Sequence, residues 1–251
     1  MVNILMNGCN GKMGQVITGL VETDENARIT AGVDIYDGIK NSYPVYASIE
    51  EVDVPFDVII DFSNASVIDG LIDYCEKTKK PVVICTTGLS DQQLAKIDKL
   101  SETCAVLRSA NMSIGVNVLM KLIKQAVARL APEGFDVEIV EKHHNQKLDA
   151  PSGTALALAD SINEEMDNCY EYVFDRSQVR KKRDKKELGI SAVRGGNIVG
   201  EHDVIFAGTD EVITISHTAY SKAIFAKGSI AGAKYIADKE PGLYDMSDVM
   251  E

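Results

Sequence analysis

The sequence predicts an α/β fold with two domains, and three observations support this prediction. In the first hundred residues, short apolar runs alternate with amphipathic stretches, as strands alternate with crossover helices in a parallel sheet. After Asn111 this rhythm gives way to one long helical pattern and then to strand-like runs joined by glycine-containing turns. The length of 251 residues leaves room for two domains that each bury a core.

The elements of the first half follow one another with short links. Several of the strands are continuous β-branched runs, which is typical of a sheet covered on both faces. The predicted strands are Val2 to Met6, Arg28 to Val33, Asp57 to Asp61, Pro81 to Cys85 and Cys104 to Leu107. The predicted helices are Lys12 to Glu22, Ala65 to Lys77 and Ser90 to Leu100. Because successive βα units make right-handed crossovers, we expect a doubly wound, Rossmann-type domain.

The second half has a different order of elements. A helix is predicted over Gly115 to Leu130 from the spacing of its apolar residues, and a short helix from about Gly153. The predicted strands are Phe135 to Val140, Gly189 to Arg194, Ile198 to Phe206 and Glu211 to His217. A last helix is predicted over Ile224 to Ala237, before Pro241-Gly242. Strands without intervening helices favour an antiparallel or mixed sheet, hence a smaller α+β domain.

Composition excludes several classes of protein. Hydrophobic residues make up 45% and charged residues 25%, as in ordinary globular proteins. The 38 acidic residues outnumber the 26 basic ones, and a formal charge of -12 argues against nucleic acid as a partner. No apolar run approaches the roughly 18 residues of a membrane span, and Met1 to Gly8 has no cationic leader. We therefore expect a cytoplasmic protein without a membrane partner.

The five cysteines favour buried or incidental thiols. Cys9, Cys75, Cys85, Cys104 and Cys169 are scattered, odd in number and form no C-x-x-C pair. We expect neither a disulfide framework nor a structural metal.

The densest charge feature is the segment from Arg176 to Lys186, which holds seven basic residues and the single acid Asp184. No aromatic residue interleaves with it, so a solvated loop is preferred to a nucleic-acid site.

A glycine loop directly follows the first predicted strand and opens a helix. It reads Gly8-Cys9-Asn10-Gly11-Lys12-Met13-Gly14, in which glycines permit a tight turn and close approach of a pyrophosphate to the helix N-terminus. Asp34 stands twenty residues after Gly14, at the end of the second strand, where a carboxylate accepts hydrogen bonds from ribose hydroxyls. The pattern indicates a dinucleotide site; a glycine turn that only packs a helix is the alternative.

Two more loops leave the carboxyl ends of predicted strands. They are Cys85-Thr86-Thr87-Gly88 and Ser109-Ala110-Asn111-Met112. Ligands of open α/β sheets bind at this edge, so we expect these residues to contact the nicotinamide half of the cofactor. Each loop alone is also ordinary turn chemistry.

The block Glu141 to Ala155 concentrates charge-handling side chains. His143, His144 and Lys147 lie in a polar loop after a strand, and adjacent histidines in an extended chain point to opposite faces. Ser152-Gly153-Thr154 follows with hydroxyls and free N–H groups at a helix start, which suits a carboxylate or phosphate. Exposed histidines and a plain N-cap by Ser152 are the alternatives. The block predicts a substrate with more than one negative charge.

The sequence as a whole resembles the dihydrodipicolinate reductase (4-hydroxy-tetrahydrodipicolinate reductase) family of bacterial lysine and diaminopimelate biosynthesis. The matching blocks are NGCNGKMG at 7–14, VIIDFS at 58–63, CTTG at 85–88, SANMSIGVN at 109–117, EKHHNQKLDAPSGTA at 141–155, RGGNIVGEH at 194–202 and GLYDMSDV at 242–249. The HH-x-x-K-x-DAPSGTA block is the most specific of these.

The resemblance implies an NAD(P)H-dependent reductase of a cyclic dicarboxylate. It implies a dinucleotide-binding domain of residues 1–112 and 222–251, and a substrate-binding domain of residues 113–221 through which four copies assemble. His143 becomes the catalytic proton donor or acceptor, Lys147 the proton donor and His144 a substrate contact, with Gly153 and Thr154 on a substrate carboxylate. The family's cofactor contacts fall on residues 8–13, Asp34, residues 85–87 and residues 109–112.

This chain departs from the family pattern at three positions. Cys85 replaces a glycine before the two threonines, and Asn145 and Gln146 replace basic residues that some members carry. We therefore assign no catalytic role to Asn145 or Gln146.

The preferred cofactor is predicted from Asp34 and its neighbours. Its carboxylate repels a 2′-phosphate, and the following Ile35 and Tyr36 cannot offset that charge. Lys12 is the one cation in the glycine loop, where a pyrophosphate is its expected partner. NADH is therefore expected to be preferred, with NADPH also accepted.

Two other functions remain open at the level of sequence. One is another two-domain nicotinamide reductase, such as an aspartate-type dehydrogenase, and the other is a non-catalytic nucleotide sensor. A sensor requires neither Lys147 nor the Ser152-Gly153-Thr154 helix start, so their presence favours an enzyme.

Overall fold

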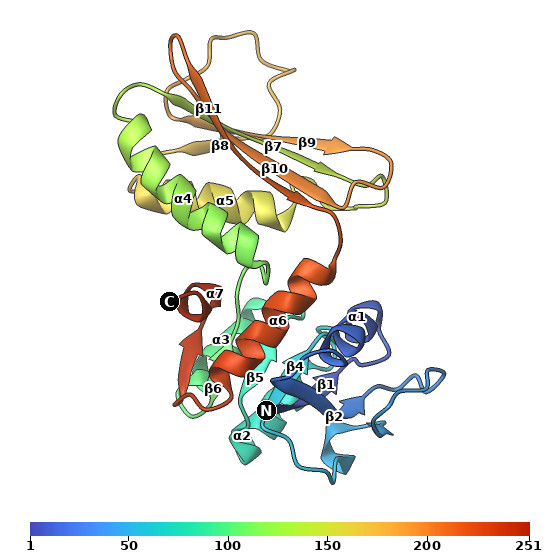
Figure 1. The fold of residues 1–251 in the computed structure, drawn as a ribbon. Helices are drawn as coiled ribbons and strands as arrows, with labels where there is room; N and C mark the ends of the chain where they lie inside the picture. Colours follow the sequence, from blue (N-terminus) through green and yellow to red (C-terminus); the bar gives the residue numbers. More distant parts are fainter. The chain divides into compact units, whose positions relative to one another are not determined.

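The computed structural model describes all residues, Met1–Glu251, and divides them into two compact units (Figure 1). Unit 1 consists of Met1–Ile114 together with Ala223–Glu251, and unit 2 of Gly115–Lys222. The chain thus leaves unit 1 once and returns to it at Ala223, the first residue of α6 (Ala223–Ile236). No helix is both long and apolar enough to cross a membrane.

Unit 1 is built on a seven-stranded parallel sheet with the order β12-β6-β5-β4-β1-β2-β3. The strands are β1 (Val2–Asn7), β2 (Ala27–Val33), β3 (Val45–Tyr46), β4 (Val58–Asp61), β5 (Val82–Ile84), β6 (Ala105–Leu107) and β12 (Gly242–Tyr244). Strand order reverses between β1 and β4, which is where open α/β sheets bind ligands.

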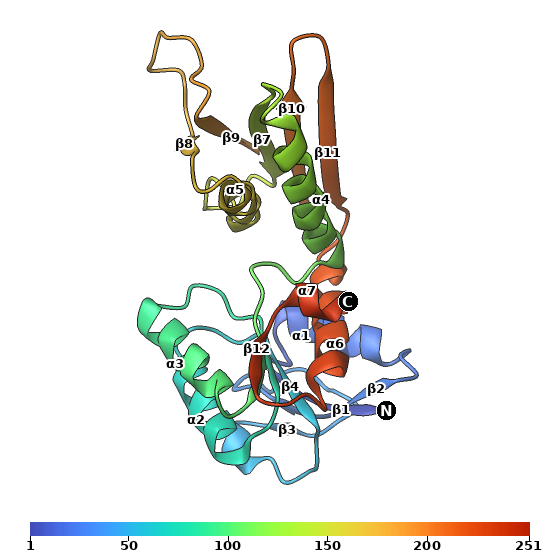
Figure 2. The same ribbon diagram turned by 90° about the vertical axis from the view of Figure 1, so that its left-hand side faces the viewer.

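Helices cover both faces of this sheet, because alternate residues of its strands are buried on opposite sides. Ile4 and Met6 of β1 pack under α1 (Lys12–Val21) and α6 (Ala223–Ile236). Leu5 faces α2 (Ile68–Thr78) and α3 (Asp91–Ser101) on the other side. Figure 2 shows these two helix layers on either side of the strands. The predicted Rossmann-type arrangement is confirmed.

Several short elements of unit 1 were not predicted. They are β3, β12, the 3₁₀ turn η1 (Ile49–Glu51) and α7 (Met246–Val249), none longer than four residues. The helix α2 starts at Ile68 and not at Ala65, because Asn64 forms a turn in which its side-chain oxygen accepts from the Ser66 N–H at 3.0 Å. Segments this short carry no measurable periodicity.

Unit 2 is a five-stranded mixed sheet with two helices. Its strands, in the order β11-β10-β7-β9-β8, are β11 (Val212–Ala219), β10 (Gly200–Ala207), β7 (Asp136–His143), β9 (Glu187–Arg194) and β8 (Glu171–Val173). The pairs β10–β11 and β10–β7 are antiparallel, whereas β7–β9 and β8–β9 are parallel. The predicted mixed sheet is confirmed, and β8 is an addition.

The core of unit 2 lies between one face of the sheet and the helices α4 (Ile114–Leu130) and α5 (Gly153–Glu165). Ile123 and Leu158 from the helices meet Ile139 and Phe206 from the strands. No helix covers the opposite face (Figure 1).

The basic segment is exposed over most of its length but is tied to unit 2 by ion pairs. Arg176 and Arg183 both reach the Glu138 carboxylate at 2.8 Å, and Arg183 also reaches Asp136 at 2.7 Å. The prediction of a solvated loop is wrong for Arg183, which is half-buried and also donates to the Val137 carbonyl. These acidic partners lie some forty residues earlier in the chain, outside any local charge pattern.

Candidate active site

The glycine loop of unit 1 has the geometry of a nucleotide cradle. Gly8 has a φ of +80°, and a Cβ there would lie 2.7 Å from the Phe62 carbonyl oxygen. A Cβ on Gly14 would lie 2.3 Å from the Gly8 carbonyl oxygen, so only glycine lets α1 start this close to the loop. No side chain caps the N-terminus of α1. Its first-turn N–H groups therefore retain the anion affinity of a helix start.

Asp34 is joined to this loop by hydrogen bonds to backbone N–H groups. One carboxylate oxygen accepts from Asn10 at 2.9 Å, and the other accepts from Tyr36 at 3.0 Å. Each oxygen keeps a second lone pair for a ligand hydroxyl.

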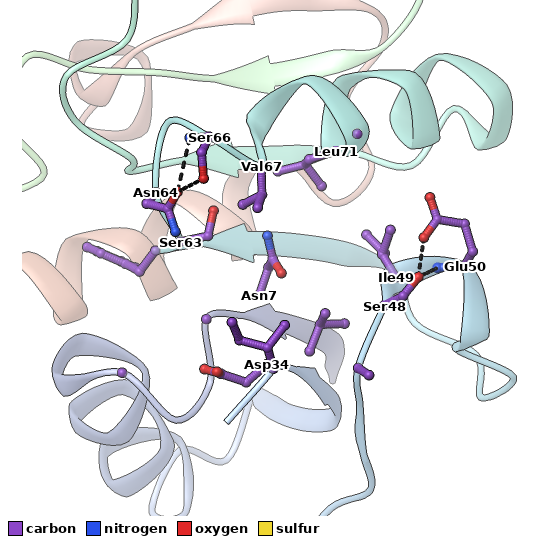
Figure 3. A pocket seen from close by; sticks show the side chains of 17 residues that line it. Asn7, Asp34, Ser48, Ile49, Glu50, Ser63, Asn64, Ser66, Val67 and Leu71 are labelled. Carbon is purple, nitrogen blue, oxygen red and sulfur yellow. Dashed lines mark hydrogen bonds between the residues drawn. The ribbon is translucent and has the colours of Figure 1, made fainter. Parts of the chain in front are cut away.

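A pocket of about 600 Å³ opens between the glycine loop, η1 and the start of α2. Figure 3 shows Asn7 and Asp34 between Ser48 and Glu50 on one side and Ser63 and its neighbours on the other. Gly8 and Gly11 also line it, whereas residues 85–87 and 109–112 do not. Asp34 and Glu50 are its charged lining residues, and none is basic.

The loop after β5 is connected to this region through Asp61, a fully buried carboxylate at the end of β4. Asp61 accepts hydrogen bonds from Asn7 at 2.8 Å, from Ser63 at 2.6 Å and from Thr86 at 2.7 Å. Burial raises the pKa of Asp61 in spite of these bonds. Burial also raises the pKa of the Cys85 thiol well above its ordinary value, which keeps the thiol protonated.

The loop after β6 is largely buried. Asn111 accepts a hydrogen bond from the Ser113 N–H at 2.8 Å, and the Met112 side chain packs in the core beneath α6. Ser109 is half-buried and Ala110 is exposed. The Met112 side chain is therefore part of the core of unit 1.

In unit 2, His143 is the last residue of β7 and is buried, not in the polar loop where the sequence placed it. Its Nδ1 lies 2.6 Å from Glu141, a fully buried carboxylate that also receives both terminal nitrogens of Arg194 at 2.7 Å. Burial alone would raise the pKa of Glu141, but hydrogen bonds from Arg194, His143 and the Ser152 N–H lower it below its usual value. Burial lowers the pKa of His143, which is therefore neutral near pH 7.

A third histidine, His202 of β10, completes the buried cluster. Its ring meets that of His143 edge to face at 5.2 Å, and its Nε2 lies 3.1 Å from the Ser152 hydroxyl. Ser152 also caps α5 by accepting from the Ala155 N–H at 3.2 Å. Burial and the neighbouring His143 lower the pKa of His202 to about 4.

Lys147 and the start of α5 converge on one carboxylate. The Lys147 ammonium lies 2.8 Å from the Asp149 carboxylate, and hydrogen bonds from Lys147 and from the Gly153 backbone lower the pKa of Asp149. Gly153 is exposed, and the space where its side chain would be is open. The structure thus brings Lys147 and Gly153 together, with half-buried Thr154 beside them.

Three residues of this cluster were not predicted: Glu141, Arg194 and His202. All three lie in blocks that the sequence marks as specific, EKHH at 141–144 and RGGNIVGEH at 194–202. The blocks are fifty residues apart, and only the pairing of β7 with β9 and β10 joins them.

Two family models cover nearly the whole chain. The model described as dihydrodipicolinate reductase, N-terminus, matches residues 2–112, and the one described as dihydrodipicolinate reductase, C-terminus, matches residues 115–250. The chain belongs to the dihydrodipicolinate reductase family.

Curated relatives of the dihydrodipicolinate reductase family match over the full length. The 4-hydroxy-tetrahydrodipicolinate reductase of Caldanaerobacter subterraneus subsp. tengcongensis is 49% identical, over 100% of this chain and 99% of that protein. The enzyme of the same name from Clostridium botulinum is 47% identical, over 100% and 98%. The predicted family, and with it an oxidoreductase of lysine and diaminopimelate biosynthesis, is confirmed.

Solved structures agree with this assignment. The dipicolinate-bound dihydrodipicolinate reductase from Paenisporosarcina sp. TG-14 superposes with a TM-score of 0.82 at 26% identity, over 100% of both chains. A probable dehydrogenase from Thermotoga maritima, at 14% identity and a TM-score of 0.63, shares the fold.

Proposed function

We propose that this chain uses NADH or NADPH to reduce 4-hydroxy-tetrahydrodipicolinate to tetrahydrodipicolinate, with the dinucleotide on unit 1 and the substrate on unit 2. The observation that carries this proposal is the convergence of Lys147 and the Gly153 backbone on the Asp149 carboxylate. Donors that hold one carboxylate can also hold that of a dicarboxylic substrate. The Paenisporosarcina relative, which binds dipicolinate, supports a substrate of this class.

The residues of unit 1 fit a nicotinamide dinucleotide. The glycine cradle leaves no room for side chains, and Asp34 presents acceptors to ribose hydroxyls. Residues 8–13, 85–87 and 109–112 complete the proposed binding surface. When bound, the reduced nicotinamide supplies a hydride to an electron-poor ring carbon of the substrate.

Residues of unit 2 then manage charge and protons. Lys147 delivers a proton to the enamine that remains after hydride addition. Before that step, the positive charge of Lys147 stabilises the negative charge of the bound substrate. His143 handles a proton as donor or acceptor, and His144 contacts the substrate. Ser152, Gly153 and Thr154 hold one carboxylate at the start of α5, where the helix dipole adds to their hydrogen bonds.

NADH is the proposed preferred cofactor. The pocket beside Asp34 contains a second carboxylate, Glu50, and no basic residue. A 2′-phosphate with nearly two negative charges would have no counter-charge among these lining residues. NADPH is accepted less efficiently.

A homotetramer is proposed to form through unit 2. The sheet face opposite its helices is uncovered and contains Val140, Ile205 and the exposed Val193 and Val212. The same face carries Lys142, which pairs with Glu201 at 3.0 Å and with Asp203 at 3.2 Å. A mixture of apolar and polar side chains is typical of a subunit interface. Light scattering should give about four times the chain mass of 27.3 kDa, and a monomer would contradict the proposal.

The proposed reaction is tested by loss of nicotinamide absorbance. Dihydrodipicolinate, generated in situ, is added to the chain with NADH or NADPH. Turnover should be rapid with NADH, and 2,6-pyridinedicarboxylate should compete with the substrate. No turnover with either cofactor would contradict the proposal and leave a nucleotide sensor.

A further inference from the structure

Glu141 is the point at which the parts of the unit 2 cluster meet. Its two oxygens accept four hydrogen bonds: from His143 Nδ1 at 2.6 Å, from the two terminal nitrogens of Arg194 at 2.7 Å, and from the Ser152 N–H at 2.9 Å. The side chain is 0% exposed. One carboxylate therefore joins the end of β7, the end of β9 and the start of α5.

The connection continues from Arg194 to the proposed proton donor. The same terminal nitrogen of Arg194 that reaches Glu141 also donates to the Asp149 carbonyl at 2.6 Å. The Asp149 carboxylate in turn accepts from Lys147 at 2.8 Å. The hydrogen bonds of Glu141, Arg194 and Asp149 thus connect His143, Lys147 and the N-terminus of α5.

The contacts of Glu141 determine where the proton of a neutral His143 resides. An ionised carboxylate only accepts hydrogen bonds, so the short contact requires a hydrogen on Nδ1. In the neutral ring Nε2 is then unprotonated. Gly200 keeps the space beside Nε2 open, because a Cβ at residue 200 would lie 3.0 Å from that nitrogen.

We propose that Glu141, held by Arg194, is a positioning residue that fixes His143 in the tautomer with the proton on Nδ1, so that Nε2 acts as a proton acceptor. This inference rests on the proposed function, in which His143 handles a proton. The proposed function leaves open whether His143 donates or accepts that proton. With Nε2 unprotonated, His143 can only be the acceptor in the resting enzyme.

The tautomer of the unmodified chain is the first test. The chain has four histidines, so the ¹⁵N resonances of histidine-labelled protein can be assigned by replacing each one in turn. The ring nitrogens of His143 should show a protonated Nδ1 and an unprotonated Nε2 at pH 7.5. A proton on Nε2 would overturn the proposal, and this measurement requires no variant of Glu141.

Glu141→Gln is the second test, because it keeps the shape of the side chain and replaces one oxygen by an NH₂ group. In either orientation the amide NH₂ meets one terminal nitrogen of Arg194, so Arg194 does not decide between the two. The Ser152 N–H can only donate, whereas the imidazole can change tautomer, so the amide NH₂ should face His143. The ring should then carry its proton on Nε2. We expect kcat to fall about a hundredfold and KM to change less than about threefold, since the wrong tautomer removes the acceptor without removing the substrate contacts.

Glu187→Gln is the matched control. Glu187 is the other buried glutamate of unit 2 and is also paired with an arginine, Arg176, at 3.1 Å. It begins β9, whereas Arg194 ends that strand. The control should lose stability but keep the His143 tautomer and kcat. Equal effects of the two substitutions on the tautomer and on kcat would overturn the proposal and make Glu141 a structural ion pair.

The two readouts separate this inference from the proposed function. A Glu141→Gln protein with the altered tautomer but full activity would refute the role of His143 in the reaction, and the positioning itself would stand. An unaltered tautomer would refute the positioning, whatever the activity.

Discussion

Lys147 is the side chain on which the proposed proton delivery depends. Lys147→Ala should lower kcat at least about a hundredfold, because loss of a positioned general acid typically costs 10²–10⁴. NADH affinity, measured by calorimetric titration, should stay near that of the parent chain. Lys124→Ala is the control, since Lys124 of α4 also pairs with an acid, Glu164, at 3.0 Å.

The two adjacent histidines should respond differently in the same assay. His143→Ala should resemble Lys147→Ala, whereas His144→Ala should raise KM more than it lowers kcat, as expected of a binding contact. The reverse ranking would exchange their roles, and near-normal turnover of Lys147→Ala would remove Lys147 from the mechanism.

Thr154 is expected to hold a carboxylate at the start of α5. Thr154→Val replaces the hydroxyl by a methyl group of similar size, so the inhibition constant of 2,6-pyridinedicarboxylate should rise. A lost charge-assisted hydrogen bond is worth roughly 1.5–3 kcal/mol, or about ten- to a hundredfold. Unchanged inhibition would place the anion site elsewhere.

Asp34 and Ile35 are expected to set the choice of cofactor. The parent chain should prefer NADH over NADPH by about tenfold in kcat/KM, equivalent to about 1.4 kcal/mol. Ile35 is 93% exposed, so Ile35→Arg should leave the fold intact. The added guanidinium should raise kcat/KM for NADPH and so reduce the preference for NADH. Ile35→Gln introduces a polar but uncharged side chain and should leave the preference for NADH unchanged. Equal use of both cofactors by the parent would refute the role assigned to Asp34.

At the scale of elements, α1 contains two glycines that test the nucleotide cradle. Gly14→Ala should destabilise the fold by about 1–3 kcal/mol and weaken NADH binding, because its Cβ has no space against the Gly8 carbonyl. Gly19→Ala should instead stabilise it by about 0.5–1 kcal/mol, because residue 19 is exposed, has open space and lies in a helix. Urea unfolding measures both. Similar effects of the two substitutions would show that the close approach of α1 to the loop is unimportant.

The strand β7 illustrates how an element determines the chemistry of its residues. Its burial alternates strictly from Asp136 to His143, with Glu141 and His143 on the core face. Because residues two apart share a face, the strand itself brings this carboxylate and this imidazole together. His144 lies beyond the strand end and is half-buried.

At the scale of the whole molecule, the buried His202 links folding to pH. Its pKa is about 4 in the folded chain against an ordinary 6.5, so between these values the unfolded chain binds a proton that the folded chain does not. The free energy of unfolding should therefore be highest above pH 6.5 and fall as the pH drops toward 4. Between pH 7 and pH 5, protonation of His202 in the unfolded chain should lower the free energy of unfolding by about 2 kcal/mol.

His202→Gln should reduce this pH dependence while keeping a partner for the Ser152 hydroxyl. Urea unfolding at pH 7 and pH 5 gives the comparison. The free energy of unfolding of the variant should still fall with pH, but less steeply, because burial also lowers the pKa of His143 and of His217. An identical slope in parent and variant would mean that His202 is not buried in its neutral form.

The amino-acid sequence was enough to predict the fold class of both units, most of their helices and strands, and the main binding loops. Apolar β-branched runs, helical spacing and glycines report on burial and backbone conformation, which are local properties. Short stretches of sequence were therefore enough to predict most strands of the parallel sheet, the glycine loop before α1 and the Ser152 cap of α5. The specific block from Glu141 to Ala155 led to the family, which the full-length relatives confirm.

Which side chains contact one another became clear from the three-dimensional fold. Glu141 and Arg194 are 53 residues apart, and the parallel register that places His143 opposite Arg194 brings them together. The same holds for the ion pairs of Arg183 and for η1, which adds Ser48 and Glu50 to the pocket beside Asp34. Such contacts depend on strand pairing across long separations, and no local pattern encodes that pairing.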